Sequence, residues 1–124
     1  MTTLRRLPAI REEDQLLTAV LELAKFAGWR VCHFRPARTA MGWRTALQGH
    51  KGWPDLAMVK GERFIVAELK SSTGVTSLEQ TYWLRDLLRA GVEVHVWRPA
   101  DWDLGTIAET LECKGRIIKA AGVR

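Results

Sequence analysis

Two short β-rich runs separated by three residues constrain the fold of this chain more than any other feature. The runs are Pro54–Val59 and Arg63–Leu69, and Lys60-Gly61-Glu62 lies between them. A short connection with a glycine at its centre is typical of a β-hairpin, in which the two strands pair antiparallel. The sequence therefore predicts a sheet that contains this hairpin.

The remaining elements alternate between helical and strand-like patterns. Apolar residues at helical spacing predict helices over Glu12–Ala27 and Ser77–Ala90, each followed by a glycine. Strands are expected at Trp29–Phe34 and Val92–Arg98, and a short third helix from about Asp103 to Leu111. The expected order is α-β-β-β-α-β-α, which indicates an α/β fold with a small mixed β-sheet flanked by helices.

Length and composition favour one domain in a reducing compartment. A chain of 124 residues suits a single domain, and no repeat or linker interrupts it. We expect one domain over 1–124, with a loose N-terminal arm over 1–11, a long basic loop over 35–52 and a basic tail over 112–124. No apolar run approaches the ~18 residues of a membrane span, and no secretory signal begins the chain. Cys32 and Cys113 are too few for a disulfide framework or a four-ligand zinc site, so we expect a cytoplasmic protein.

The charge distribution favours a polyanionic partner. The formal net charge is +5 and the isoelectric point about 9.7. Between Trp29 and Pro54 there is no acidic residue, whereas basic and aromatic residues alternate there, a pattern that favours nucleic acid. The residues expected to contact DNA are Arg35, Arg38, Trp43, Arg44, His50 and Lys51. Trp43 could stack on an unpaired base. For His50-Lys51, an ordinary exposed loop pair is an equal alternative.

The hairpin also predicts where charged residues meet. With Gly61-Glu62 at the tip, Asp55 faces Glu68, and opposed side chains have Cβ atoms about 4.5–5.5 Å apart. Strand alternation places Lys70 on the same face as Glu68. Two such carboxylates repel each other unless a cation lies between them, and Mg²⁺ binds a few carboxylate oxygens while keeping sites for water and phosphate. The alternative is a surface cluster in which Lys70 only neutralises Glu68 and Asp55 caps the strand.

Two further residues have both a functional and a structural interpretation. Glu13 lies near the middle of the apolar face of the first helix, so it either points inward or only complements the helix dipole. Gln80 has the spacing of a capping box with Ser77. Thr76 and Glu79 offer the same cap one residue earlier, which would leave Gln80 free for a site.

Several of these residues together resemble a known nuclease family. The segments that carry the resemblance are Gly52-Trp53-Pro54-Asp55-Leu56, Glu68-Leu69-Lys70, and Gln80 in the following helix. They are similar to the VRR-NUC branch of the PD-(D/E)xK nucleases, and the similarity covers most of the chain. It implies a restriction-endonuclease-like core and hydrolysis of DNA phosphodiester bonds with bound Mg²⁺ or Mn²⁺. The stretch Met41–Lys51 departs from the pattern, because it looks longer than the usual linker before the motif.

The resemblance implies a catalytic role for each matching residue. Asp55 and Glu68 match the metal-binding acids, and Glu13 matches a further metal ligand from the first helix. Lys70 matches the lysine that orients the attacking water or stabilises developing charge. Gln80 matches a glutamine placed near the metal-bound water or the scissile phosphate.

These expectations combine into one hypothesis, a metal-dependent endodeoxyribonuclease selective for branched DNA such as a Holliday junction. The resemblance includes small stand-alone members encoded by phages or mobile elements, which would act in the host cytoplasm. Cutting two strands of a junction needs two sites, so we expect a homodimer. The alternative is a DNA-binding accessory protein that keeps the nuclease fold without cutting, and a weaker one is a nuclease acting on RNA.

Overall fold

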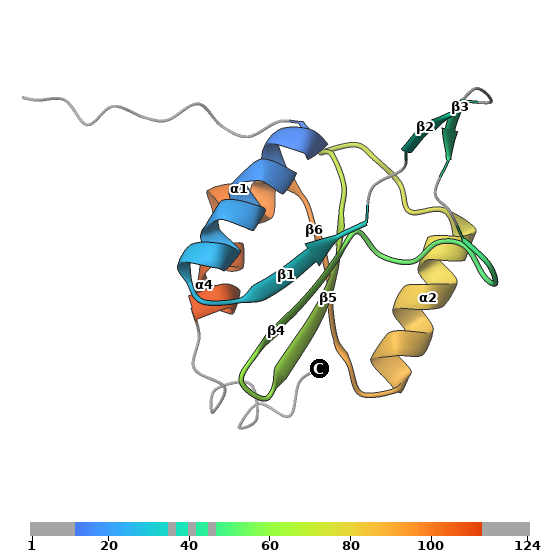
Figure 1. Cartoon of the computed structure of the whole chain (residues 1–124). Helices are drawn as coiled ribbons and strands as arrows, with labels where there is room; N and C mark the ends of the chain where they lie inside the picture. Colours follow the sequence, from blue (N-terminus) through green and yellow to red (C-terminus); the bar gives the residue numbers. More distant parts are fainter. Residues whose placement is uncertain (1–11, 35–36, 40–41, 45–46, 113–124) are drawn as a thin grey trace, which may run out of the picture.

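The computed structural model describes residues 12–34, 37–39, 42–44 and 47–112 (Figure 1). Its elements are α1 (Glu13–Phe26), β1 (Arg30–His33), β2 (Ala37–Thr39), β3 (Gly42–Arg44), β4 (Leu56–Lys60), β5 (Arg63–Leu69), α2 (Leu78–Arg89), β6 (Glu93–Trp97), α3 (Pro99–Asp103) and α4 (Thr106–Glu112). They form the expected mixed α/β fold, a four-stranded mixed sheet flanked by helices. Within the described ranges, none of the helices has both the length and the apolar character that a membrane crossing requires.

The sheet has the strand order β1-β4-β5-β6, antiparallel except for the parallel pair β5/β6. The predicted hairpin register is confirmed, because Ala57 pairs with Val66. The ladder ends where Leu56 pairs with Ala67, so Asp55 lies just outside the strand. The helix α2 connects the parallel strands β5 and β6. Its N-terminus therefore lies beside the end of the sheet at which β5 finishes.

One face of the sheet carries the hydrophobic core. The helices α1, α3 and α4 lie on this side (Figure 1), and α1 buries Leu16, Val20 and Ala24 at helical spacing. Alternate residues of β5, including Ile65 and Leu69, complete the same cluster from the sheet. Removing these apolar side chains from water is the main driving force that holds the helices on this face.

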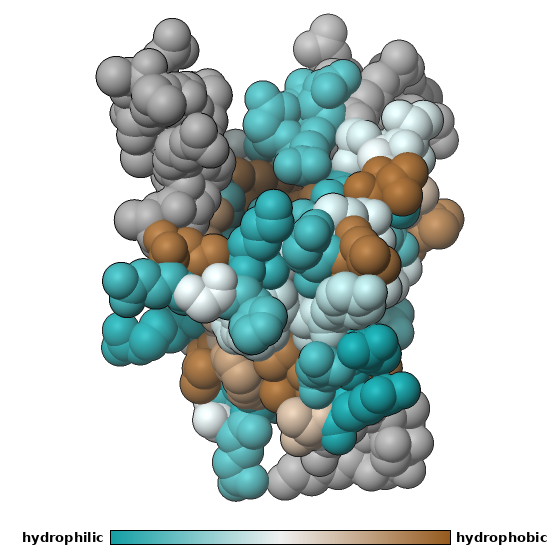
Figure 2. Space-filling model, turned by 90° about the vertical axis from the view of Figure 1, so that its right-hand side faces the viewer, coloured by the Kyte–Doolittle hydropathy of each residue, from teal (hydrophilic) through white to brown (hydrophobic). Residues whose placement is uncertain are grey.

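The opposite face is covered only in part. The helix α2 contacts it along β6, and every residue of α2 keeps some exposure. On the part of this face that α2 leaves uncovered, Val59 is 44% exposed and Phe64 is 40% exposed. Figure 2, seen from the α2 side, shows hydrophobic side chains at the surface among hydrophilic ones. Glu68 belongs to this half-open face, because it alternates with Ala67 and Leu69 of the core.

The structure corrects the prediction that 35–52 is a loop throughout. This segment contains the antiparallel pair of β2 and β3, in which Arg38 pairs with Trp43. Strands of three residues are too short to produce the alternating pattern by which a strand is recognised in a sequence. The expected arm over 1–11 and the expected tail beyond Glu112 lie outside the described residues.

The helix expected from about Asp103 to Leu111 is present as α4, but it begins at Thr106, and a second short helix, α3, precedes it. Gly105, with a φ of 83°, separates α3 from α4. The first of them begins already at Pro99, since proline suits the first turn of a helix. The N–H of Arg98 donates to Asp101 Oδ2 at 2.7 Å, which completes this helix start.

Candidate active site

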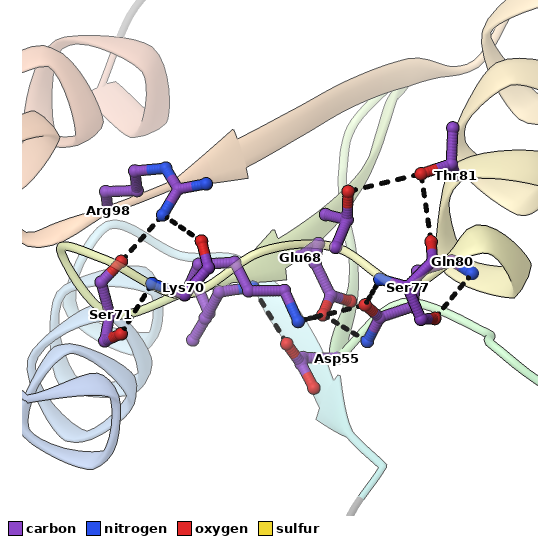
Figure 3. A network of polar contacts seen from close by, with 11 residues as sticks. Asp55, Glu68, Lys70, Ser71, Ser77, Gln80, Thr81 and Arg98 are labelled. Atoms are coloured by element: carbon purple, nitrogen blue, oxygen red, sulfur yellow. Dashed lines mark hydrogen bonds and ion pairs between the residues drawn. The ribbon is translucent and has the colours of Figure 1, made fainter.

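Asp55, Glu68 and Lys70 meet where β4 begins and β5 ends (Figure 3). Asp55 Oδ2 accepts a hydrogen bond from the N–H of Leu69 at 2.8 Å. Glu68 lies within β5 and is only 1% exposed. The N–H of Lys70 donates to the carbonyl oxygen of Trp97 at 2.9 Å, which extends the pairing with β6. The structure thus brings together the three residues that the hairpin register placed at one end.

Gln80 joins these charges into one network (Figure 3). Its Nε2 donates to Glu68 Oε2 at 2.8 Å, and its Oε1 accepts from Lys70 Nζ at 2.9 Å. Lys70 Nζ also lies 3.3 Å from Glu68 Oε2. The ammonium group is therefore held between an amide and a carboxylate, with its position fixed from two sides.

The same glutamine caps α2. Ser77 Oγ accepts from the N–H of Gln80 at 3.1 Å, and Gln80 Oε1 accepts from the N–H of Ser77 at 2.8 Å, so the capping box is formed. The sequence suggested that Gln80 would be available to the site only if Glu79 made the cap. That alternative is unnecessary, because Gln80 Oε1 serves both Ser77 and Lys70 while its Nε2 is left for Glu68.

Glu68 is the most perturbed acid of this cluster. Burial raises its pKa, the negative charge of Asp55 raises it further, and Lys70 offsets these effects only in part, so that the pKa is about 7. Its Oε1 is buried and has no hydrogen-bond partner among the described residues. Because a buried oxygen without a partner is costly, this position favours a proton or a cation.

Glu13 lies in the first turn of α1, within electrostatic reach of the same cluster. Partial burial raises its pKa, and the charge of Asp55 raises it further, whereas Lys70 lowers it. The side chain nevertheless remains exposed. Glu13 therefore lies exposed at the helix start, and its charge is coupled to those of Asp55 and Lys70.

The donor atoms suit a small divalent cation. Mg²⁺ is usually bound through one or two carboxylates and otherwise keeps water and phosphate oxygens. Asp55 and Glu68 supply such a pair, and the unpartnered Oε1 of Glu68 is an atom that a cation would satisfy. In the part of the chain that the structure describes, no three His, Cys, Asp or Glu side chains are grouped closely enough to hold a metal ion. The role of Glu13 as a further ligand stays a prediction.

Two contacts around the site escaped the sequence analysis. Arg98 Nη1 donates to the carbonyl oxygens of Ser71 at 2.8 Å and Gly74 at 2.6 Å, and so fixes the turn between β5 and α2 (Figure 3). Gly52, with a φ of 101°, lies so close to Glu79 that an added Cβ would come within 2.7 Å of its backbone. Both contacts join segments that are distant in the sequence, so no local pattern announces them.

All six residues expected to contact DNA precede the hairpin in the sequence. Three of them lie on the paired strands β2 and β3: Arg38, Trp43 and Arg44. Arg35 lies outside the described residues, whereas His50 and Lys51 are exposed beside α2. The carbonyl oxygen of His50 accepts a hydrogen bond from Trp83 Nε1 at 3.2 Å, which ties this loop to the helix. Contact of these residues with nucleic acid stays a prediction.

A scan of the chain against protein-family models gives no match, and a search of curated proteins gives none either. The chemical interpretation therefore rests on the residues of the site and their geometry.

Proposed function

We propose that this chain is a metal-dependent endodeoxyribonuclease of the VRR-NUC type, with a restriction-endonuclease-like core and a preference for branched DNA such as a Holliday junction. The observation that carries the proposal is the buried Glu68, whose Oε1 lacks a partner among the described residues although Asp55 and Lys70 lie beside it. A charge cluster with only a structural role would be expected to satisfy its buried oxygens.

The proposed reaction is attack of water on a phosphodiester anion, which requires charge neutralisation and an activated water. Asp55 and Glu68 would hold Mg²⁺ or Mn²⁺, with Glu13 as a further carboxylate nearby, and the bound ion supplies Lewis acidity and a water of lowered pKa. Lys70 stabilises the negative charge that develops on the phosphate oxygens. Gln80 positions Lys70 through Oε1 and holds Glu68 through Nε2.

The proposed DNA-binding surface is the basic segment that precedes the hairpin. Its phosphate-binding candidates are Arg35, Arg38, Arg44, His50 and Lys51. Trp43 would stack on an unpaired base. Because each chain has one such site, we propose that a cytoplasmic homodimer cuts the two strands of a junction. The exposed Val59 and Phe64 offer apolar surface of the kind that such a contact buries.

The test is a cleavage assay on end-labelled four-way junction, flap, duplex and single-stranded DNA, with matched RNA, in Mg²⁺, Mn²⁺ or EDTA. We expect metal-dependent cutting that is greatest on branched DNA and is reduced about 10²- to 10³-fold in Lys70→Ala. Lys25→Ala is the matched control, because it removes the same charge from an exposed position of α1. Binding without cutting in every metal would contradict the proposal and would favour a non-cleaving DNA-binding protein.

A further inference from the structure

A pocket of about 490 Å³ lies between the loop 49–51 and the outer face of α2. Four residues one or two helical turns apart form the helix side: Glu79, Tyr82, Trp83 and Asp86. This volume is within the range of about 300–1,000 Å³ that is typical of small-molecule sites. We propose that the pocket binds an unpaired nucleobase next to the cleaved bond and prefers bases with an exocyclic amino group. The inference deepens the proposed function and rests on it.

Tyr82 and Trp83 give the pocket an aromatic wall. Trp83 is fixed by its hydrogen bond to the His50 carbonyl oxygen and by edge-on contact with Trp53, with 5.0 Å between ring centroids. Tyr82 is 46% exposed, and the guanidinium carbon of Arg85 lies 5.1 Å from its ring centroid. Oriented and partly exposed aromatic rings are the surfaces on which unpaired bases stack in single-stranded nucleic-acid sites.

The charged groups suit a base better than a phosphate. Glu79 and Asp86 line the helix side, and Asp86 Oδ1 is bonded to Arg85 Nε at 3.1 Å. Two carboxylates would repel a phosphate group, but a carboxylate accepts hydrogen bonds from exocyclic amino groups such as cytosine N4. Lys51 and His50 line the other side, where they could contact the backbone phosphate of the same nucleotide.

The pocket adjoins the proposed active site. Glu79 lines the pocket, and its chain neighbour Gln80 bonds both Glu68 and Lys70. A strand whose scissile phosphate lies beside Lys70 can therefore reach the pocket with a nearby nucleotide. In a duplex that base is paired and stacked, and extracting it costs a few kcal/mol, whereas in a flap or at a junction it is already available. The pocket thus supplies a physical basis for selecting DNA structure.

The first test compares the affinity of the full chain for blunt duplex DNA and for the same duplex with a single-stranded oligo-dC tail, by fluorescence anisotropy in EDTA. We expect Tyr82→Ala to lower the ratio of tailed to blunt affinity by about five- to 100-fold, as for loss of a stacked base. Tyr82→Phe should retain the ratio. Leu88→Ala is the matched control, because Leu88 lies on the same helix, is also 46% exposed and does not line the pocket.

The second test replaces the oligo-dC tail by oligo-dT. We expect the dC tail to bind more tightly, and Glu79→Ala to reduce this preference while retaining the Cβ that lies against Gly52. Equal ratios in Tyr82→Ala and the wild type, alongside metal-dependent junction cleavage by the wild type, would overturn the pocket and leave the nuclease proposal intact. A wild-type chain that neither binds nor cleaves DNA would overturn both.

Discussion

Two buried glutamates on neighbouring strands have opposite electrostatic properties. Glu68 on β5 is 1% exposed and Glu93 on β6 is 6% exposed. Glu93 Oε2 accepts from Arg63 Nη2 at 2.8 Å and lies 3.0 Å from His95 Nε2, and its Oε1 accepts from Arg63 Nε at 3.3 Å. Burial acts to raise the pKa of Glu93, but the bonds with His95 and Arg63 outweigh it and the pKa is lowered.

Glu68 is as buried as Glu93, yet its pKa is raised to about 7 because its neighbours include a second carboxylate. Lys70 and Gln80 both bond Oε2, and the buried Oε1 has no partner within the described ranges. Burial alone therefore does not decide whether the pKa of a carboxyl group is raised or lowered. The difference lies in whether the fold itself supplies all the compensating charge or leaves part of it to a proton or a bound ion.

The largest expected effect follows from breaking the compensated pair. Arg63→Ala leaves Glu93 buried and removes the hydrogen bond to the Thr110 carbonyl oxygen at 3.0 Å, so it should lower the free energy of unfolding by about 3–5 kcal/mol. Urea denaturation measures this change. Arg85→Ala breaks the exposed pair with Asp86 and should cost about 0–1 kcal/mol. Equal losses in the two variants would show that the buried pair contributes no special stability.

The next effect concerns activity. Lys70→Ala should reduce kcat/KM for junction cleavage by about 10²- to 10³-fold. The substitution removes a preorganised positive charge that would otherwise stabilise the negative charge developing on the phosphate oxygens. Its unfolding free energy should fall less than that of Arg63→Ala, since Glu68, with a pKa of about 7, can take up a proton in place of the lost ammonium. Cleavage kinetics and urea denaturation on the same preparation separate the two roles. Unchanged cleavage would remove Lys70 from the mechanism.

A pH titration of stability in EDTA should show the two glutamates with opposite signs. The folded pKa of Glu68 lies above its ordinary value of 4.5, so stability should fall by about 2–3 kcal/mol as the pH rises from about 4.5 to 7. The lowered pKa of Glu93 instead contributes stability above about pH 4.5, which is lost as the pH falls through its folded pKa. Glu68→Gln should be more stable than the wild type at pH 8 but not at pH 4. A constant difference between them across this range would argue against the raised pKa.

The smallest expected effect is stabilisation by metal. At ten times its Kd, Mg²⁺ should raise the free energy of unfolding by about 1.4 kcal/mol, provided that it binds only the folded chain. Thermal melting with and without Mg²⁺ measures this change, and Glu68→Gln should respond less. Arg85→Ala should respond as the wild type does, because its exposed pair is not part of the cluster. An identical response in Glu68→Gln would mean that the ion binds elsewhere.

The sequence predicted those features that depend on local periodicity. A turn at Gly61 fixes the hairpin register, and the two-residue period of a strand then brings Asp55, Glu68 and Lys70 to one end. The partnership of Arg63 with Glu93 is not predictable from the sequence, although both residues lie in segments with a strand pattern. It depends on β5 and β6 being parallel neighbours, which only the assembled sheet determines.

The remaining misses have similar physical causes. The strands β2 and β3 are too short to show a period, and the break at Gly105 divides a helical pattern that continues on both sides. The sequence spacing presents Gln80 with two alternative roles, a helix cap or a member of the site. The structure combines the two, because Ser77 and Lys70 approach the same side-chain oxygen.

This double use limits which amino acids position 80 can accept. Glutamine alone, among side chains of its length, presents an uncharged acceptor and a donor together; glutamate only accepts when ionised, and lysine only donates. Gln80→Glu would preserve the acceptor of the cap but set a third negative charge beside Glu68, whereas a shorter asparagine would shorten the reach to both partners. Because an amide does not titrate, the contact of Gln80 with Lys70 does not change with pH, whereas the contact of Lys70 with Glu68 weakens as Glu68 takes up a proton. Fraying of the first turn of α2 would release Lys70 and Glu68 together, so the start of this helix and the proposed catalytic centre form one cooperative unit.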